Sequence, residues 1–193
     1  MSRLVDDLLD VSRVSTGKLR LERRGVELVG IIDAAVDACR PAMDTRLQHF
    51  AVQLPAHALE VHGDPVRLAQ IVSNLLDNAS KYTPERGEIR LSVVVADDAI
   101  VLSVADNGIG ITPEALPNVF EPFVQDTHAI GFHSGGLGIG LTVVRELVEA
   151  HAGTVVASSA GTGLGSRFVV TLPLASPGGH DISASLPPPP SHG

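Results

Sequence analysis

Apolar residues recur every three or four positions in four segments of the chain, which predicts four amphipathic helices. These segments are residues 3–14, 28–40, 64–82 and 138–151. Asp64-Pro65 marks a helix start, because aspartate caps a first turn and proline fits the first helical position. Pro41 is expected to end or kink the second helix, and Gly153 to close the fourth in the left-handed position after it.

Shorter runs, either apolar or alternating between apolar and polar positions, predict strands between these helices. They cover residues 18–22, 49–54, 59–62, 88–96, 100–105, 154–158 and 166–172. Asp97-Asp98-Ala99 predicts a hairpin turn, and a second hairpin is expected around residues 161–165. After residue 174 the composition shifts to Ser, Gly and Pro, which predicts a disordered tail or linker over residues 175–193.

The composition narrows the class of protein. A length of 193 residues suits one domain or at most two, and 44% hydrophobic residues are enough for a buried core. The net charge of −8 disfavours nucleic acid or an anionic membrane as a partner. No run approaches the ~18 consecutive apolar residues of a membrane-spanning helix, and the first residues do not resemble a secretory signal. The single cysteine, Cys39, excludes an internal disulfide and fits a reducing compartment.

The helix expected over residues 64–82 carries a polar stripe along one side. Its members, spaced three and four apart, are Arg67, Gln70, Asn74, Asn78 and Lys81. A solvated surface is the ordinary interpretation of such a stripe. Asparagine, however, is a poor helix former, so two of them suggest amide oxygens placed to hold a ligand. An amide oxygen can join the coordination shell of Mg²⁺, and a nearby lysine can meet a phosphate as a point charge.

Glycine-rich loops gather in the second half of the chain, where eleven of the 19 glycines lie between residues 108 and 165. Residues 106–110 follow a strand and predict either an ordinary turn or a loop that approaches a flat ligand. In the second case the carboxylate of Asp106 would accept a hydrogen bond from an exocyclic amine such as that of adenine.

Residues 135–141 lead into a helix, whose N-terminus and neighbouring glycines favour a phosphate, although a flexible hinge is the alternative. The spacing is not that of a Walker-A loop or a dinucleotide fingerprint. Residues 161–166 also fit a simple hairpin turn. His128 and His133 lie in the preceding loop, where solvent-exposed histidines are expected rather than a metal site.

Taken together and in order, these motifs resemble the catalytic, ATP-binding domain of sensor histidine kinases. Residues 74–83 resemble the N box of that family, 106–110 its G1 box, 120–123 its F box, 135–141 its G2 box and 161–166 its G3 region. The resemblance covers about residues 19–174. Residues 1–17 resemble the end of the second helix of the dimerisation and phosphotransfer hairpin, which precedes this domain in the family.

The resemblance implies an α/β (α+β) two-layer sandwich of the Bergerat type, in which helices cover one face of a mixed, mainly antiparallel sheet. Residues 18–174 would form this domain, and residues 124–137 would form a lid over ATP. The nucleotide-binding residues implied by the resemblance are Asn74, Asn78, Lys81, Tyr82, Asp106, Gly108, Gly110, Gly136, Leu137, Gly138, Gly140, Leu141 and Thr162.

The resemblance also implies a role for each part of this set. Asn78 would coordinate Mg²⁺, with Asn74 supporting nearby, and Lys81 would contact phosphate, so that Asn78 and Lys81 form the catalytic pair. Gly136, Gly138 and Gly140 would cradle the phosphates at the start of the helix, flanked by Leu137 and Leu141. Tyr82 would flank the adenine and Asp106 would receive its amine. Gly108 and Gly110 would shape that pocket, and Thr162 would lie near the adenine edge.

The implied activity is that of a protein-histidine kinase in a two-component system. The γ-phosphoryl group of MgATP would pass to a histidine on the dimerisation hairpin of a homodimer and then to a response regulator. That histidine is missing here, because residues 1–27 contain none. A cytoplasmic location is expected, without nucleic-acid or membrane contact by this segment, any membrane anchor lying elsewhere in the full-length protein.

Two other functions are compatible with the same motifs. One is an ATPase of the wider GHKL superfamily, such as a chaperone or mismatch-repair enzyme, which needs a glutamate near the N box to activate water; here Gln70 stands four residues before Asn74. The other is a non-catalytic regulatory module that binds a nucleotide or docks a partner.

Overall fold

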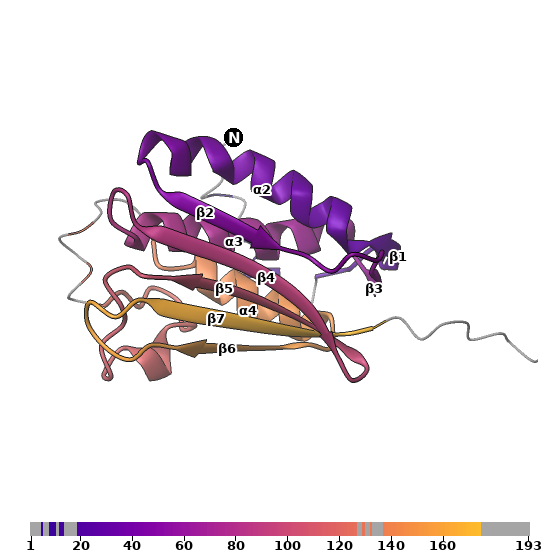
Figure 1. Cartoon of the computed structure of the whole chain (residues 1–193). Helices are drawn as coiled ribbons and strands as arrows, with labels where there is room; N and C mark the ends of the chain where they lie inside the picture. Colours follow the sequence, from indigo (N-terminus) through magenta and orange to yellow (C-terminus); the bar gives the residue numbers. More distant parts are fainter. Residues whose placement is uncertain are drawn as a thin grey trace, which may run out of the picture.

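Five strands form one sheet in the order β2-β4-β5-β7-β6 (Figure 1). Their bounds are β2 His49–Gln53, β4 Glu88–Ala96, β5 Ala99–Asp106, β6 Thr154–Ser158 and β7 Ser166–Pro173. β2 runs parallel to β4, and the other neighbouring pairs are antiparallel. A two-stranded antiparallel sheet pairs β1 (Arg24–Glu27) with β3 (Glu60–Gly63). This computed structural model describes residues 5, 8–10, 12–13, 19–126, 129, 132 and 137–174.

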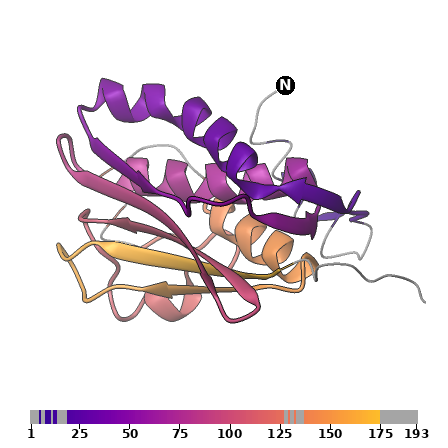
Figure 2. The ribbon, with the colours of Figure 1, turned by 45° about the vertical axis from the view of Figure 1, so that its right-hand side comes forward.

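Helices α2, α3 and α4 lie together on one face of the five-stranded sheet (Figure 1, and Figure 2 from a second direction). They span Leu28–Thr45, Pro65–Tyr82 and Gly140–Ala150, and a short 3₁₀ helix, η1, covers Leu116–Asn118. The predicted sandwich, with a mixed and mainly antiparallel sheet covered by helices on one face, is confirmed. No helix within the described part of the chain is both long and apolar enough to cross a membrane.

The two faces of the sheet differ because successive residues of a strand point to opposite sides. On β4, Ile89, Leu91 and Val93 are buried under the helices, whereas Val94 is 48% exposed. Val156 on the edge strand β6 is 60% exposed on the same open side. The core therefore lies between the sheet and the helices, and the opposite face of the sheet has no helix over it among the described residues.

The first predicted strand is wrong. Residues 19–23 form no strand, and β1 begins at Arg24. Apolar alternation misled here because these residues make isolated contacts with the helix layer instead of a ladder. The Glu22 N–H donates to the Asp64 carboxylate over 3.0 Å, and Arg23 donates to the Ala150 carbonyl.

Helix α2 runs through Pro41 to Thr45, so Pro41 does not end it. The missing N–H of Pro41 leaves the Asp37 carbonyl without a helical donor, but both residues are exposed, so water can donate to that carbonyl. The Pro41 carbonyl also accepts from the Thr45 hydroxyl over 2.8 Å. The helix ends instead where Leu47 takes a left-handed φ of 54° and the Gln48 N–H donates to the Met43 carbonyl over 3.0 Å.

Helix α4 ends with the same motif, and Gly153 is not its left-handed residue. That residue is Ala152, with a φ of 59°, while the Gly153 N–H donates to the Val148 carbonyl over 2.9 Å. Glycine is required at 153 for space, because a Cβ there would lie 2.4 Å from the Thr171 carbonyl oxygen. The helix also begins at Gly140 rather than at residue 138, since Gly138 has a φ of 68°.

His151, a buried residue, links the C-terminal end of α4 to the N-terminal end of α3. Its Nε2 accepts from the Asp64 N–H over 3.1 Å, and its Nδ1 lies 2.7 Å from the Leu147 carbonyl, so this network assigns the proton to Nδ1. Burial lowers the pKa of His151 below its ordinary value. The charge of Arg23 acts in the same direction, against the Leu147 hydrogen bond and the charge of Asp64. The fold therefore favours neutral His151.

We expect the free energy of unfolding to fall as the pH drops below about 6.5. The unfolded chain protonates His151 near that pH, whereas the folded chain does so only at lower pH, so acid favours unfolding. His151→Gln keeps an acceptor for the Asp64 N–H but does not titrate, and should flatten this part of the profile. Urea unfolding between about pH 5.5 and 7.5 measures both slopes. Equal slopes in the two proteins would contradict the expectation.

Candidate functional site

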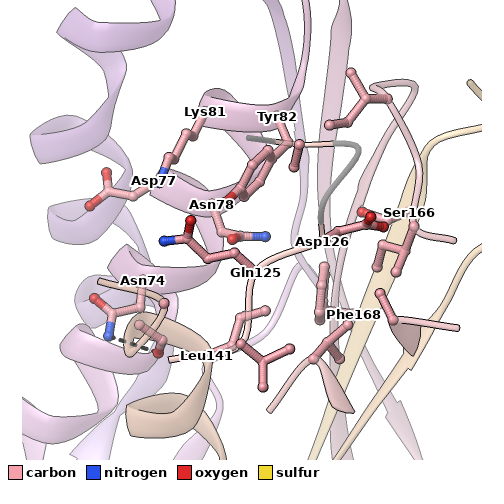
Figure 3. Close-up of a pocket in the computed structure, with 18 of the residues that line it drawn as sticks. Asn74, Asp77, Asn78, Lys81, Tyr82, Gln125, Asp126, Leu141, Ser166 and Phe168 are labelled. Carbon is pink, nitrogen blue, oxygen red and sulfur yellow. Dashed lines mark hydrogen bonds between the residues drawn. The ribbon is translucent and has the colours of Figure 1, made fainter. Parts of the chain in front are cut away.

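A cavity of about 320 Å³ opens between the helix layer and the strand ends of the sheet (Figure 3). Its walls come from α3, the loop after β5, residues 115–126, the first turn of α4 and the start of β7. Figure 3 shows Lys81 and Tyr82 on the α3 side, with Ser166 and Phe168 on the strand side. The volume is in the range of small-molecule sites. Segments far apart in the sequence thus meet at one place.

The α3 wall contains the second half of the predicted polar stripe. Its lining residues are Asn74, Asp77, Asn78, Lys81 and Tyr82. The Lys81 ammonium lies 5.2 Å from the centroid of the Tyr82 ring, a cation–π distance. The Asn74 amide donates to the Gly140 carbonyl over 3.3 Å. Asn74 therefore links α3 to the first turn of α4, the two elements that bound this part of the cavity.

The first half of the stripe lies outside the cavity. Arg67 and Asp10 form an ion pair of 2.6 Å, and the Gln70 amide donates to the same Asp10 oxygen over 3.1 Å. Arg67 also donates to the Gln70 side-chain oxygen over 2.8 Å. Asp10 is only 5% exposed. The solvated-surface interpretation is therefore wrong for Arg67 and Gln70, which bind the N-terminal helical segment instead.

Asp106 lies at the end of β5, where the strand reaches the cavity. One carboxylate oxygen accepts from the Gly108 N–H over 2.8 Å, and the other accepts from the Ser166 hydroxyl over 2.6 Å. Burial raises the pKa of Asp106, while the hydrogen bond from Ser166 opposes that shift. The carboxyl group is thus oriented by two donors and still borders the cavity, where it can accept from a ligand.

The loop after β5 packs backbone to backbone against the β6–β7 turn. Gly110 has a φ of 71°, and a Cβ there would lie 2.0 Å from the Gly161 carbonyl oxygen. Gly110 lines the cavity, whereas Gly108 lies behind it, with its Cβ position 2.2 Å from the Tyr82 carbonyl oxygen. Thr162 is exposed and does not line the cavity.

The start of α4 contributes four of the predicted residues to the lining, namely Leu137, Gly138, Gly140 and Leu141. Open space adjoins Gly140, because no heavy atom apart from its chain neighbours and the nearby backbone of α4 lies within 4 Å of its Cβ position. The helix N-terminus therefore faces an open part of the cavity, where its N–H groups and dipole favour an anion. Gly136, the fifth predicted residue of this loop, lies outside the described residues.

Only part of the expected lid falls within the described residues. Val124, Gln125, Asp126 and Ala129 line the cavity, and Asp126 accepts a hydrogen bond from the Thr112 N–H over 2.9 Å. His128 and His133 lie outside the described residues, so their predicted exposure stays a prediction. Residues 175–193 lie wholly outside the described part of the chain, and residues 1–17 lie largely outside it. Their assignments therefore stay predictions.

Several lining residues were missed from the sequence. Ser166 is the last residue of the 161–166 motif, but nothing local indicates that its hydroxyl meets a carboxylate 60 residues away. An apolar wall was missed as well, although the alternation of β7 would have placed Phe168 on the covered face. The lining residues outside every predicted motif and the predicted lid are Ile111, Ala115, Val119 and Phe168. Others lie within a predicted motif or the lid but were not predicted individually, namely Asp77, Ile109, Val124, Gln125, Asp126, Ala129, Ile139 and Ser166.

Comparison with known proteins gives concordant matches. Residues 63–176 match the family described as histidine kinase-, DNA gyrase B-, and HSP90-like ATPase. The chain is 33% identical over 177 residues to the alginate biosynthesis sensor protein KinB of Pseudomonas aeruginosa, covering 90% of this chain and 29% of that protein. It is 33% identical over 174 residues to the signal transduction histidine-protein kinase BaeS of Escherichia coli (strain K12), covering 90% and 37%. The chain thus spans about a third of the length of these relatives.

A solved structure shares the fold. The full-length structure of ShkA in complex with AMPPNP matches with a TM-score of 0.77 and 29% identity, over 89% of this chain and 35% of that one. The resemblance to sensor histidine kinase catalytic domains is therefore confirmed for both sequence and fold.

Asp106→Asn is expected to unfold at neutral pH no more easily than the wild type. A raised pKa means that the folded state holds the carboxyl proton more tightly than the unfolded chain, so ionisation costs stability as the pH rises. Asparagine is uncharged, can accept from the Gly108 N–H, and can donate to a reoriented Ser166 hydroxyl. Urea unfolding between about pH 4 and 7.5 tests this. A clear loss of stability at neutral pH would argue against a destabilising carboxylate.

Proposed function

Because this chain belongs to the family of histidine kinase-, DNA gyrase B- and HSP90-like ATPases, we propose that it binds MgATP in this cavity. It does so as the catalytic domain of a two-component sensor histidine kinase. The γ-phosphoryl group then passes to a histidine on a dimerisation hairpin and onward to a response regulator. One observation carries the proposal: Asn78 and Lys81 from α3, Asp106 from β5 and the first turn of α4 converge on one cavity.

The two ends of the cavity suit the two ends of ATP. The Asp106 carboxylate accepts hydrogen bonds and so fits the exocyclic amine of adenine, beside an apolar wall that includes Ile109 and Phe168. Lys81 and the open start of α4 at Gly140 supply positive potential, which fits the phosphates. Guanine would present a carbonyl to Asp106, leaving two acceptors unpaired, so the site favours adenine.

The residues present also fit Mg²⁺. The described residues contain no cluster of three His, Cys, Asp or Glu side chains that would hold a metal by themselves. Mg²⁺ commonly keeps several waters and is shared between one or two protein oxygens and substrate phosphates. Asn78 supplies such an oxygen on the cavity wall, with Asn74 held one turn earlier by the Gly140 carbonyl. Bound there, Mg²⁺ would neutralise charge on the transferred phosphoryl group.

Phosphoryl transfer needs positioning and charge stabilisation more than covalent help from the protein. In the proposed reaction Asp106 holds the base, α4 and Lys81 hold the phosphates, and the acceptor histidine comes from outside the cavity. The part of this chain that resembles the dimerisation hairpin contacts α3 through Asp10, Arg67 and Gln70. That contact supports an approach of the hairpin from the N-terminal end of α3.

The competing ATPase function is less well supported. That function needs a water-activating carboxylate near the N box. Asp77 of α3 borders the cavity and accepts from the Cys39 thiol over 3.4 Å. The residue four positions before Asn74 is Gln70. Its amide donates to Asp10, and it does not line the cavity. A neutral amide engaged with a neighbouring carboxylate cannot accept a proton from water.

Asn78→Ala should weaken MgATP binding by at least about tenfold, because the metal loses its protein ligand. Binding of ATP in EDTA should change little. Calorimetry with Mg²⁺ and with EDTA measures both effects, and Asn118→Ala, which removes an exposed asparagine on η1, is the matched control. Equal loss under both conditions would indicate a disrupted cavity and no metal role, and no loss would count against the assignment.

The 193-residue chain should not phosphorylate itself on histidine. Residues 1–27 contain no histidine, and in-line transfer needs an acceptor nitrogen about 3–3.5 Å from the γ-phosphorus. Incubation with γ-labelled ATP should give no acid-labile label on this chain. Weak labelling should appear on a separately supplied dimerisation hairpin that carries histidine. Stoichiometric acid-labile label on the chain alone would show that the acceptor has been misassigned.

A further inference from the structure

The carboxyl end of α3 carries Lys81 and Tyr82, and it is capped by a side chain from another part of the fold. The last carbonyls of a helix have no partner within the helix. Here the Gln48 amide nitrogen donates to the Ser80 carbonyl over 2.9 Å and to the Thr83 carbonyl over 2.8 Å. The Ser80 hydroxyl donates back to the Gln48 oxygen over 2.8 Å. Both ends of one amide are therefore used to hold the end of α3.

Arg46 adds a charged donor to the same end of the helix. Its guanidinium donates to the Ser80 carbonyl and, over 3.3 Å, to the Lys81 carbonyl. A cation at this position also suits the negative end of the helix dipole. Arg46 and Gln48 reach α3 together because the left-handed turn at Leu47, which ends α2, lies between them.

The α3 end also contacts the loop that follows Asp106. The Tyr82 carbonyl accepts from the Ile109 N–H over 3.1 Å, and the Cβ position of Gly108 lies 2.2 Å from that carbonyl oxygen. The helix end is thus bonded both to Gln48 and to the loop at the cavity. Gln48 is 7% exposed and does not line the cavity.

From these contacts we propose that Gln48 is a positioning residue of the nucleotide site. It sets the position of Lys81 and Tyr82 and, through the Tyr82 carbonyl, that of the loop beside Asp106. This inference rests on the proposed function. It predicts that loss of the Gln48 donors lowers MgATP affinity in protein that is still folded, by roughly tenfold or more, because small displacements of binding groups are costly.

A purely structural role predicts a different result. In that case removal of the cap would lower the melting temperature and leave the affinity of the folded protein unchanged. The chain has one tyrosine and no tryptophan, so its tyrosine fluorescence reports on Tyr82 alone. Because the Lys81 ammonium lies over that ring, a shift of the helix end should change the Tyr82 emission before any unfolding.

The test compares the 193-residue chain carrying Gln48→Met with two controls. Methionine keeps the length of the side chain and removes both donors and the acceptor. Leu47→Ala alters an exposed residue in the same turn, and Ile100→Val lowers stability from a buried position at the other end of β5 from Asp106. MgATP binding by calorimetry and Tyr82 emission are measured where circular dichroism shows every variant folded. We expect both to change in Gln48→Met and neither to change in the controls.

Unchanged affinity and emission in folded Gln48→Met would overturn the inference, as would an equal loss of affinity in Ile100→Val. If Gln48→Met does not fold, the same measurements are made on Gln48→Asn. Its shorter side chain keeps the donors but cannot reach both the Ser80 and the Thr83 carbonyls. If the wild type itself does not bind MgATP, the proposed function fails. If the wild type binds MgATP and the Gln48 variants bind it equally well, the positioning role is refuted and the proposed function stands.

Discussion

The burial of one side of α3 determines the rest of the structure. Leu75 and Leu76 are fully buried, and Leu68, Ile71 and Val72 are nearly so, at the centre of the layer between the other helices and the sheet. Each such side chain contributes on the order of 1.5–3 kcal/mol when it leaves water. Rotating the helix by even one residue would expose several of them. With the apolar side held in the core, the polar stripe is fixed beside it, and its second half borders the cavity.

The same constraint gives α3 two polar sites along its length. Near its start, Arg67 and Gln70 hold Asp10 of the N-terminal helical segment. Near its end, Asn78, Lys81 and Tyr82 line the cavity, and Asn74 stands between the two and bonds to the start of α4. A rigid helix thus connects the segment that resembles a dimerisation hairpin with the proposed nucleotide site. The distance between them is set by helical geometry alone.

The sequence predicted best those features that depend on neighbouring residues. Asp64 caps α3 as expected, and its carboxylate accepts from the Val66 N–H over 3.0 Å, because capping is a local interaction. The glycine at 110 was recognisable for a similar reason. What could not be predicted depends on contacts between distant segments. Gln48 looks like an ordinary polar residue before a strand, and only the packing of α2 on α3 brings its amide to the Ser80 carbonyl. The missing first strand was misjudged because alternation indicates a strand only where a partner strand exists.

The backbone contact between the loop after β5 and the β6–β7 turn bears on how such a site can evolve. The Gly163 N–H donates to the Ile109 carbonyl over 2.7 Å, and the Gly165 N–H donates to the Gly108 carbonyl over 3.1 Å. These bonds use no side chain, and Thr162 and Leu164 between them are exposed. Mutations at residues 162 and 164 can therefore accumulate without moving this boundary of the cavity. Gly163 and Gly165 cannot be replaced as freely, because both have a positive φ. Ligand preference can drift through the side chains of the other walls while this junction keeps its geometry.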